Sequence, residues 1–133
     1  IALNNGNIFL VWQSVYQDGS GWGVFATILS PEREIVVPEF QVNTTSNSHQ
    51  WNPRAFSLSD GRILVLWGSD GQDGDVYGVF ARLLNLDGSE SLAEFQVNSY
   101  TSHHQLDGSV TELAGNKIFF VWESYSQDTS NYG

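Results

Sequence analysis

The sequence contains no cysteine and no methionine, and it has few charged residues, of which very few are basic. The absence of cysteine excludes a disulfide framework, a thiolate nucleophile and cysteine-ligated zinc. Charged residues make up 15% of the 133 residues, and 15 acidic residues against 5 basic ones give a formal net charge of −10. A surface this acidic repels phosphate groups, so nucleic acids and anionic membranes are unfavourable partners. No apolar run approaches the roughly 20 residues that a membrane-spanning helix needs.

The residues that are abundant favour an all-β protein. Apolar residues make up 41% of the chain, which is too many for a disordered segment, and there are 13 glycines. Most of the remainder is Ser, Asn, Gln, Thr and Asp, a composition typical of short strands joined by polar turns. No stretch shows sustained apolar residues at the spacing of a helix face, so no helix is predicted.

A period of 55 residues runs through the whole chain without a gap. Trp12, Trp67 and Trp122 follow it, and residues 39–43 (EFQVN) recur as residues 94–98. The period divides the chain into repeat unit 1 (1–55, starting inside a blade), repeat unit 2 (56–110) and a partial unit 3 (111–133). Self-similarity of this kind is typical of solenoids, propellers and other arrays.

Each unit is predicted to contain four antiparallel strands. The first strand is expected at about 53–58 and 109–113, the second at 7–12, 62–67 and 117–122, the third at 22–29 and 76–84, and the fourth at 38–43 and 93–98. The second strand is apolar at every position, so both of its faces should be covered. Four-stranded units covered on both faces and repeated in tandem predict β-propeller-like blades. The chain holds about 2.4 such units, so we expect it to be part of a larger array or to associate with copies of itself.

A series of short motifs resembles the repeats of large secreted bacterial surface proteins, including those with haemolysin-type calcium-binding repeats. The motifs are EFQVN at 39–43 and 94–98, Asp60-Gly61 before an apolar strand that ends in Trp67 and is followed by Ser69, QDG at 72–74, and YGVFA at 77–81. The resemblance implies a propeller-like repeat region in a secreted or surface-attached protein, with no defined activity. The nonapeptide calcium repeats of that family are absent here, so its calcium chemistry is not implied.

The loop at 69–75 is a candidate calcium site. It contains three carboxylates within six residues, those of Asp70, Asp73 and Asp75. Calcium takes six to eight oxygen ligands, often from such loops. The alternative is that Asp73 and its equivalents Asp18 and Asp128 form Asx turns, in which the carboxylate accepts from a backbone N–H two residues on. Calcium is the one cofactor that the sequence suggests.

The aromatic residues fall into two groups. Trp12, Trp67 and Trp122 end apolar strands, so we expect them in the core, each with a partner for its indole N–H. Another aromatic residue follows the polar loop and begins the third strand, at Trp22, Tyr77 and Tyr132. With the neighbouring amides of Gln17, Gln72 and Gln127, these rings are candidates for stacking on sugars, although aromatic residues are also ordinary at strand starts. His49 and His104, one per unit, are expected to be loop residues rather than zinc ligands.

The function hypotheses follow from the repeat. The polar residues that stand out are repeated, which indicates a structural requirement, and the chain has no Ser-His-Asp, P-loop or dinucleotide signature. We therefore predict a non-catalytic extracellular module of a secreted or cell-surface protein, serving as a structural or adhesive scaffold. The alternative is a glycan-binding, lectin-like module with repeated aromatic sites. The expected partners are neighbouring repeats, copies of the chain itself, and glycans in the alternative; nucleic acids and membrane insertion are not expected.

Overall fold

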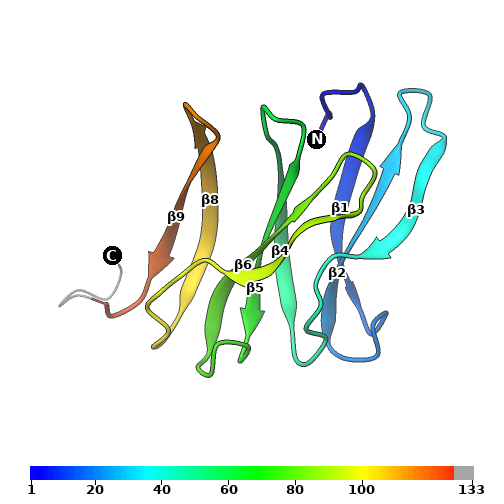
Figure 1. Ribbon diagram of the computed structural model, residues 1–133. Helices are drawn as coiled ribbons and strands as arrows, with labels where there is room; N and C mark the ends of the chain where they lie inside the picture. The colour runs from blue at the N-terminus through cyan, green and yellow to red at the C-terminus, as the bar shows by residue number, and fades with distance from the viewer. Residues whose placement is uncertain (128–133) are drawn as a thin grey trace.

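The computed structural model describes residues 1–127, and this part of the chain forms nine β-strands (Figure 1). They are β1 (Ile8–Val15), β2 (Trp22–Leu29), β3 (Ile35–Gln41), β4 (Gln50–Ser57), β5 (Ile63–Asp70), β6 (Tyr77–Leu84), β7 (Glu90–Gln96), β8 (Gln105–Leu113) and β9 (Lys117–Ser124). All pairings within the sheets are antiparallel. None of the described elements is a helix long and apolar enough to cross a membrane.

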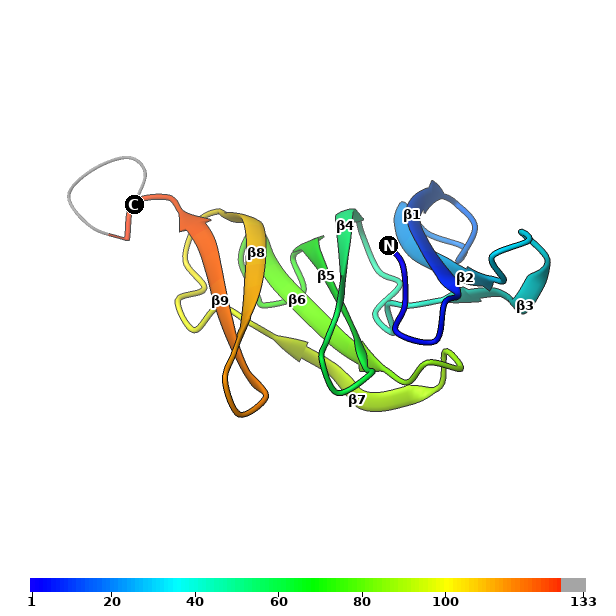
Figure 2. The same cartoon turned by 90° about the horizontal axis from the view of Figure 1, so that it is seen from above.

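The strands form three sheets in chain order, β1-β2-β3, β4-β5-β6-β7 and β8-β9. They lie in a row along the molecule, as Figures 1 and 2 show from two directions. The middle sheet has all four strands of the repeat unit. The first sheet has the equivalents of the second to fourth strands, and the third sheet those of the first and second. The prediction of an all-β chain of four-stranded, propeller-like units is confirmed.

Strand β5 is buried on both faces because it lies between the two neighbouring sheets. Alternate residues of β5 belong to two separate cores. Ile63, Val65 and Trp67 pack into the core shared with the first sheet. Leu64 and Leu66 pack into the core shared with the third sheet. This arrangement explains why the second strand of the unit is apolar at every position.

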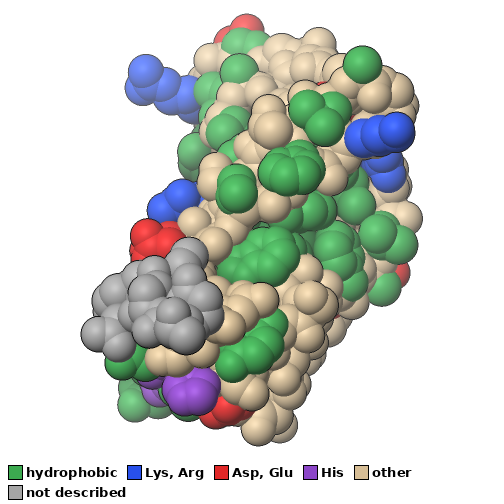
Figure 3. Space-filling model, turned by 90° about the vertical axis from the view of Figure 1, so that its left-hand side faces the viewer, with side chains coloured by type: hydrophobic (Ala, Val, Ile, Leu, Met, Phe, Trp, Pro, Cys, Tyr) green, Lys and Arg blue, Asp and Glu red, His purple; other side chains and the backbone are tan. Residues whose placement is uncertain are grey.

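The two end sheets each have an open face. On β9, Phe119 is 56% exposed and Val121 is 54% exposed, whereas the equivalent residues of β5 are at most 2% exposed. On β1, Leu10 is 41% exposed and its equivalent Val65 is fully buried. Figure 3 shows hydrophobic side chains gathered on the open side of the β8-β9 hairpin.

The three equivalent tryptophans also differ in burial. Trp67 is 1% exposed, and Trp12 and Trp122 are only partly buried. The expectation of a core tryptophan therefore holds fully in the middle sheet alone. The prediction that each indole N–H has a partner is wrong for Trp67. Its buried Nε1 has no hydrogen-bond partner among the described residues.

A pair of buried amides joins each blade to the next. The backbone N–H of Val24 donates to Asn43 Oδ1 (2.7 Å), and Asn43 Nδ2 donates to Oε1 of the fully buried Gln50 (3.1 Å). Asn98 and Gln105 make the same contacts at the next junction. Buried polar groups need partners, so the repeated Asn and Gln satisfy the backbone where the chain crosses between sheets.

Several strand boundaries differ from the prediction, and β8 begins at Gln105 rather than residue 109, as its equivalent β4 also begins early. Strand β4 begins at Gln50 rather than near residue 53, and it continues past an irregularity in register between Trp51 and Arg54. Asn52 lies there with φ 53°, the left-handed conformation expected of a β-bulge residue. Strand β3 begins at Ile35 rather than residue 38, because a proline is tolerated in an edge strand.

Candidate functional site

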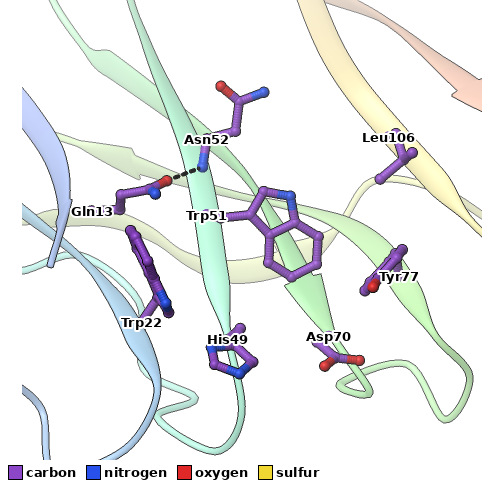
Figure 4. Close-up of a pocket in the computed structure, with 8 residues that line it drawn as sticks. All are labelled: Gln13, Trp22, His49, Trp51, Asn52, Asp70, Tyr77 and Leu106. Atoms are coloured by element: carbon purple, nitrogen blue, oxygen red, sulfur yellow. Dashed lines mark hydrogen bonds between the residues drawn. The ribbon is translucent and has the colours of Figure 1, made fainter. Parts of the chain in front are cut away.

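A pocket of about 740 Å³ opens at one end of the blades and is lined by residues of all three sheets (Figure 4). It is lined by Gln13, Trp22, His49, Trp51, Asn52, Asp70, Tyr77 and Leu106. Apart from His49, which directly precedes β4, these residues lie on six different strands. The ladder hydrogen bonds of the sheets therefore hold the lining in place.

Trp51 is the central residue of the pocket. Its indole lies directly over Gly68, since a Cβ at that glycine would come within 2.9 Å of Trp51 Cε2. The ring of Tyr77 meets it edge-on, with the ring centroids 4.9 Å apart and the planes at 81°. The repeat places Leu106 at the position equivalent to Trp51 and Gln13 at the position equivalent to Gly68. Among the described residues, this aromatic wall therefore exists at one junction only.

The two junctions between sheets share their backbone pairing but not their side-chain packing. Trp22 pairs with His49 in a parallel bridge, and Tyr77 pairs with His104 in the same way. The rings of Tyr77 and His104 then contact each other, with centroids 4.6 Å apart. No such ring contact joins Trp22 to His49 within residues 1–127, and Trp22 is 39% exposed. The first junction therefore lacks the ring contact that Tyr77 and His104 make at the second.

Hydrogen-bonding groups lie among the aromatic rings. Gln13 Oε1 accepts from the backbone N–H of Asn52 (2.7 Å), which fixes that amide at the pocket wall. Asp70 Oδ2 accepts from Ser48 Oγ (3.1 Å), and the Asp70 backbone N–H donates to the His49 carbonyl (2.9 Å). An amide, an imidazole and a carboxylate thus share one pocket with three aromatic side chains.

Trp22 and Tyr77, two of the three aromatic residues predicted to bind a ligand, line this same pocket. The third, Tyr132, lies outside the described residues. Sequence reasoning missed Trp51, Gln13 and Asn52. The signal that identifies Trp51 is its departure from the repeat, because the equivalent position in the next unit is a leucine.

The predicted amide partners lie elsewhere. Gln17 Nε2 donates to Glu39, and Gln72 Nε2 donates to Glu94. Neither glutamine lines the pocket, so the structure does not bring them together with the aromatic residues there. Each lies in the loop between the second and third strands and turns back toward the fourth strand, because the repeated glutamate there accepts its amide. Gln127 lines a separate small cavity on the third sheet.

The three aspartates of the candidate calcium loop have different partners. Asp73 Oδ1 accepts from the backbone N–H of Asp75 (3.3 Å), and Asp18 accepts from Ser20 N in the same way (3.2 Å), so the Asx turns are confirmed at these two positions. Asp128 lies outside the described residues. Asp75 Oδ2 accepts from the backbone N–H of His103 (3.0 Å), on the connection that leads into β8.

The calcium hypothesis requires these carboxylates to converge on one ion. Residues 1–127 contain no group of three or more His, Asp or Glu side chains placed to hold a metal. Asp70, Asp73 and Asp75 therefore do not form the predicted cluster. The physical reason is that each carboxylate accepts hydrogen bonds from a different segment of the chain.

No protein-family model and no curated protein matches the sequence. Among solved structures, the chain is similar to the crystal structure of an endo-arabinase from Bacteroides thetaiotaomicron, with a TM-score of 0.61 and 15% identity. The likeness covers 100% of this chain and 52% of that one, so the chain spans about half the length of that protein. The fold is β-propeller-like. At this identity the likeness establishes the fold alone.

Proposed function

We propose that this chain is a non-catalytic carbohydrate-binding module of a secreted or cell-surface protein, and that the pocket around Trp51 is its binding site. The observation behind the proposal is that Trp22, Trp51 and Tyr77 converge in one pocket with hydrogen-bonding side chains. Sugar rings present C–H faces that pack on aromatic rings, and their hydroxyl groups pair with amides, imidazoles and carboxylates. The volume of the pocket lies within the range of small-ligand sites.

Binding without catalysis agrees with the composition of the pocket. Asp70 is the one carboxylate among the residues that line it. Glycoside hydrolysis ordinarily uses two carboxylates on either side of the scissile bond. The similar propeller-like structure is named as an endo-arabinase, which is compatible with a saccharide ligand for this fold.

A structural or adhesive scaffold is the second candidate, and specific contacts between sheets favour it. Glu94 on β7 accepts from the Thr44 backbone N–H (2.6 Å) and from Thr45 Oγ1 (3.1 Å), both in the connection that follows the first sheet. Arg82 on β6 donates to the Val42 carbonyl (2.6 Å). These hydrogen bonds join adjacent blades, as expected of a scaffold built from repeats.

A glycan array with the purified chain, followed by titration calorimetry on each hit, tests the binding proposal. We expect saturable binding that weakens at least tenfold in Trp51→Ala and in Trp22→Ala. The matched control is Tyr16→Ser, since Tyr16 is a 76% exposed aromatic residue outside the pocket. Ser126 has the same left-handed backbone conformation at the equivalent position (φ 59° against 60°), so this control introduces no new strain.

Three results would contradict parts of the proposal. If no glycan binds saturably, the binding function is wrong and the scaffold becomes the better candidate. If glycans bind equally well to Trp51→Ala, the site is misplaced. If a bound polysaccharide acquires new reducing ends during incubation with the chain, the module is catalytic.

A further inference from the structure

A second cavity of about 220 Å³ adjoins the pocket. The two share Trp51, Asn52 and Leu106 in their linings, and the second extends toward the third sheet through Arg54 and Asp107. We propose that the two cavities form one groove, which takes an uncharged oligosaccharide of two or more sugars laid across Trp51. This inference rests on the proposed carbohydrate-binding function and goes beyond it in naming the length and charge of the ligand.

Trp51 has the geometry of a fixed platform between the two cavities. Its indole is supported by the backbone of Gly68, where a Cβ would come within 2.9 to 3.1 Å of three indole atoms. Tyr77 contacts the ring edge-on from the β6 side. The ring is therefore held in one orientation without a ligand, and a platform ordered in advance loses little side-chain entropy on binding.

The repeat shows that this platform is not a requirement of blade packing. Residues that the fold needs recur in each unit, as Asn43 and Asn98 do at their junctions. At the position of Trp51, by contrast, the next unit has Leu106. Gly68, the residue that makes room for the indole, is replaced by Gln13 and Glu123 in the units before and after it. A feature present once in a repeated scaffold is expected of a ligand site.

The second cavity offers hydrogen-bonding groups suited to sugar hydroxyls. Asn52 Nδ2 donates to Asp107 Oδ1 (3.0 Å), and Arg54 Nη2 lies 3.6 Å from the same oxygen. The Arg54 and Asp107 side chains are 42% and 53% exposed, so their remaining donor and acceptor atoms are accessible. Because the two charges lie side by side, this end of the groove has donors and acceptors without a net charge.

The charge of the groove selects against acidic sugars. Its ionised side chains are Asp70 at one end and the Arg54–Asp107 pair at the other, which leaves an excess of one negative charge when His49 is neutral. The whole chain has a formal net charge of −10. A uronic acid or a sulfated sugar would meet repulsion both at long range and in the groove. A neutral chain meets none.

Titration calorimetry with a length series of one neutral saccharide, from the single sugar to the tetrasaccharide, tests the groove. We expect the affinity to rise at least tenfold between the monosaccharide and the first chain that reaches the second cavity. Arg54→Ala should weaken binding of the longer chains about fivefold, the usual effect of losing one hydrogen bond, and leave the monosaccharide affinity unchanged. Arg62→Ala is the matched control, because it removes the same charge from an ion pair (with Asp60, 2.7 Å) that lines neither cavity.

The outcomes distinguish this inference from the proposed function. Equal affinities for the monosaccharide and the longer chains would overturn the groove and leave carbohydrate binding intact. So would an Arg54→Ala variant that binds the longer chains normally. If a uronic-acid chain binds as tightly as a neutral chain of the same length, the inference that the ligand is uncharged is wrong. Absence of binding to every saccharide would overturn both the groove and the function.

Discussion

The three tryptophans at equivalent positions provide a test of the stacked-blade fold. Trp67 in the middle sheet is 1% exposed, and Trp12 and Trp122 in the end sheets are partly buried. Full burial of a tryptophan removes about 200 Å² from water, which at about 25 cal/mol per Å² is worth an upper value of about 5 kcal/mol. The buried Nε1 of Trp67 has no partner among the described residues, which offsets about 1–3 kcal/mol of this.

We therefore expect Trp67→Ala to lower the free energy of unfolding by about 3 kcal/mol, and Trp12→Ala and Trp122→Ala by about half as much. Trp67→Phe removes the unpartnered N–H and keeps most of the apolar ring. It should therefore lower the free energy of unfolding by only about 1 kcal/mol. Urea titrations followed by circular dichroism measure all four variants. Equal losses in Trp67→Ala and Trp12→Ala would refute the stacking, because Phe9 and Val11 of β1 pack into the core with the second sheet and Trp12 faces the opposite, uncovered side.

Four further outcomes are expected. Gly68→Gln should reduce saccharide affinity at least tenfold with the fold retained, because the new Cβ would clash with the Trp51 indole; calorimetry with a circular dichroism check measures both. Asn98→Ala should lower the free energy of unfolding by about 2 kcal/mol, since it leaves a buried backbone N–H without its acceptor. Calcium should not raise the melting temperature, and a rise of many degrees that is lost in Asp73→Ala would contradict the turn assignment. The chain should self-associate through its open end faces, and light scattering should show less association for Phe119→Ser, whereas a wild-type monomer at all concentrations would argue against exposed blade faces.

Most of the fold could be predicted from the sequence, because the repeat presents the same strand pattern two or three times. A single strand such as Ile63–Asp70 is ambiguous, but its equivalents share the apolar run, the terminal tryptophan and the flanking turns. What escaped prediction was the start of β4. Pro53 suggests that a strand begins there, whereas the strand in fact passes through a bulge at Asn52 and extends back to the buried Gln50. A bulge leaves no periodic signature in the sequence, so its location depends on tertiary contacts.

Only part of the candidate site could be predicted from the sequence. Sequence proximity grouped Gln72 with Tyr77, yet the hydrogen bond to Glu94 directs the glutamine toward the fourth strand, away from the pocket. Proximity also grouped the three aspartates of the 69–75 loop, whose actual partners come from other segments. Trp51 is distant from Trp22 and Tyr77 along the chain. The pairing of β4, β5 and β6 brings Trp51 beside Tyr77, and the stacking of the first sheet on the second adds Trp22. Contacts between blades are not encoded locally, and these contacts build the pocket.

The two junctions between sheets show how a repeat protein can acquire one binding site without weakening its scaffold. Both junctions use the same buried Asn–Gln pair and the same parallel bridge, so the backbone has one geometry at each. At the second junction the Tyr77–His104 ring contact fills the space beside the bridge. At the first junction Trp22 is 39% exposed beside its bridge, whereas the Trp51 indole lies over Gly68 on the face of the middle sheet that is turned toward the third. Because the Asn–Gln pairs and the bridges are the same at both junctions, the pocket side chains can differ between units without weakening the crossing from one sheet to the next.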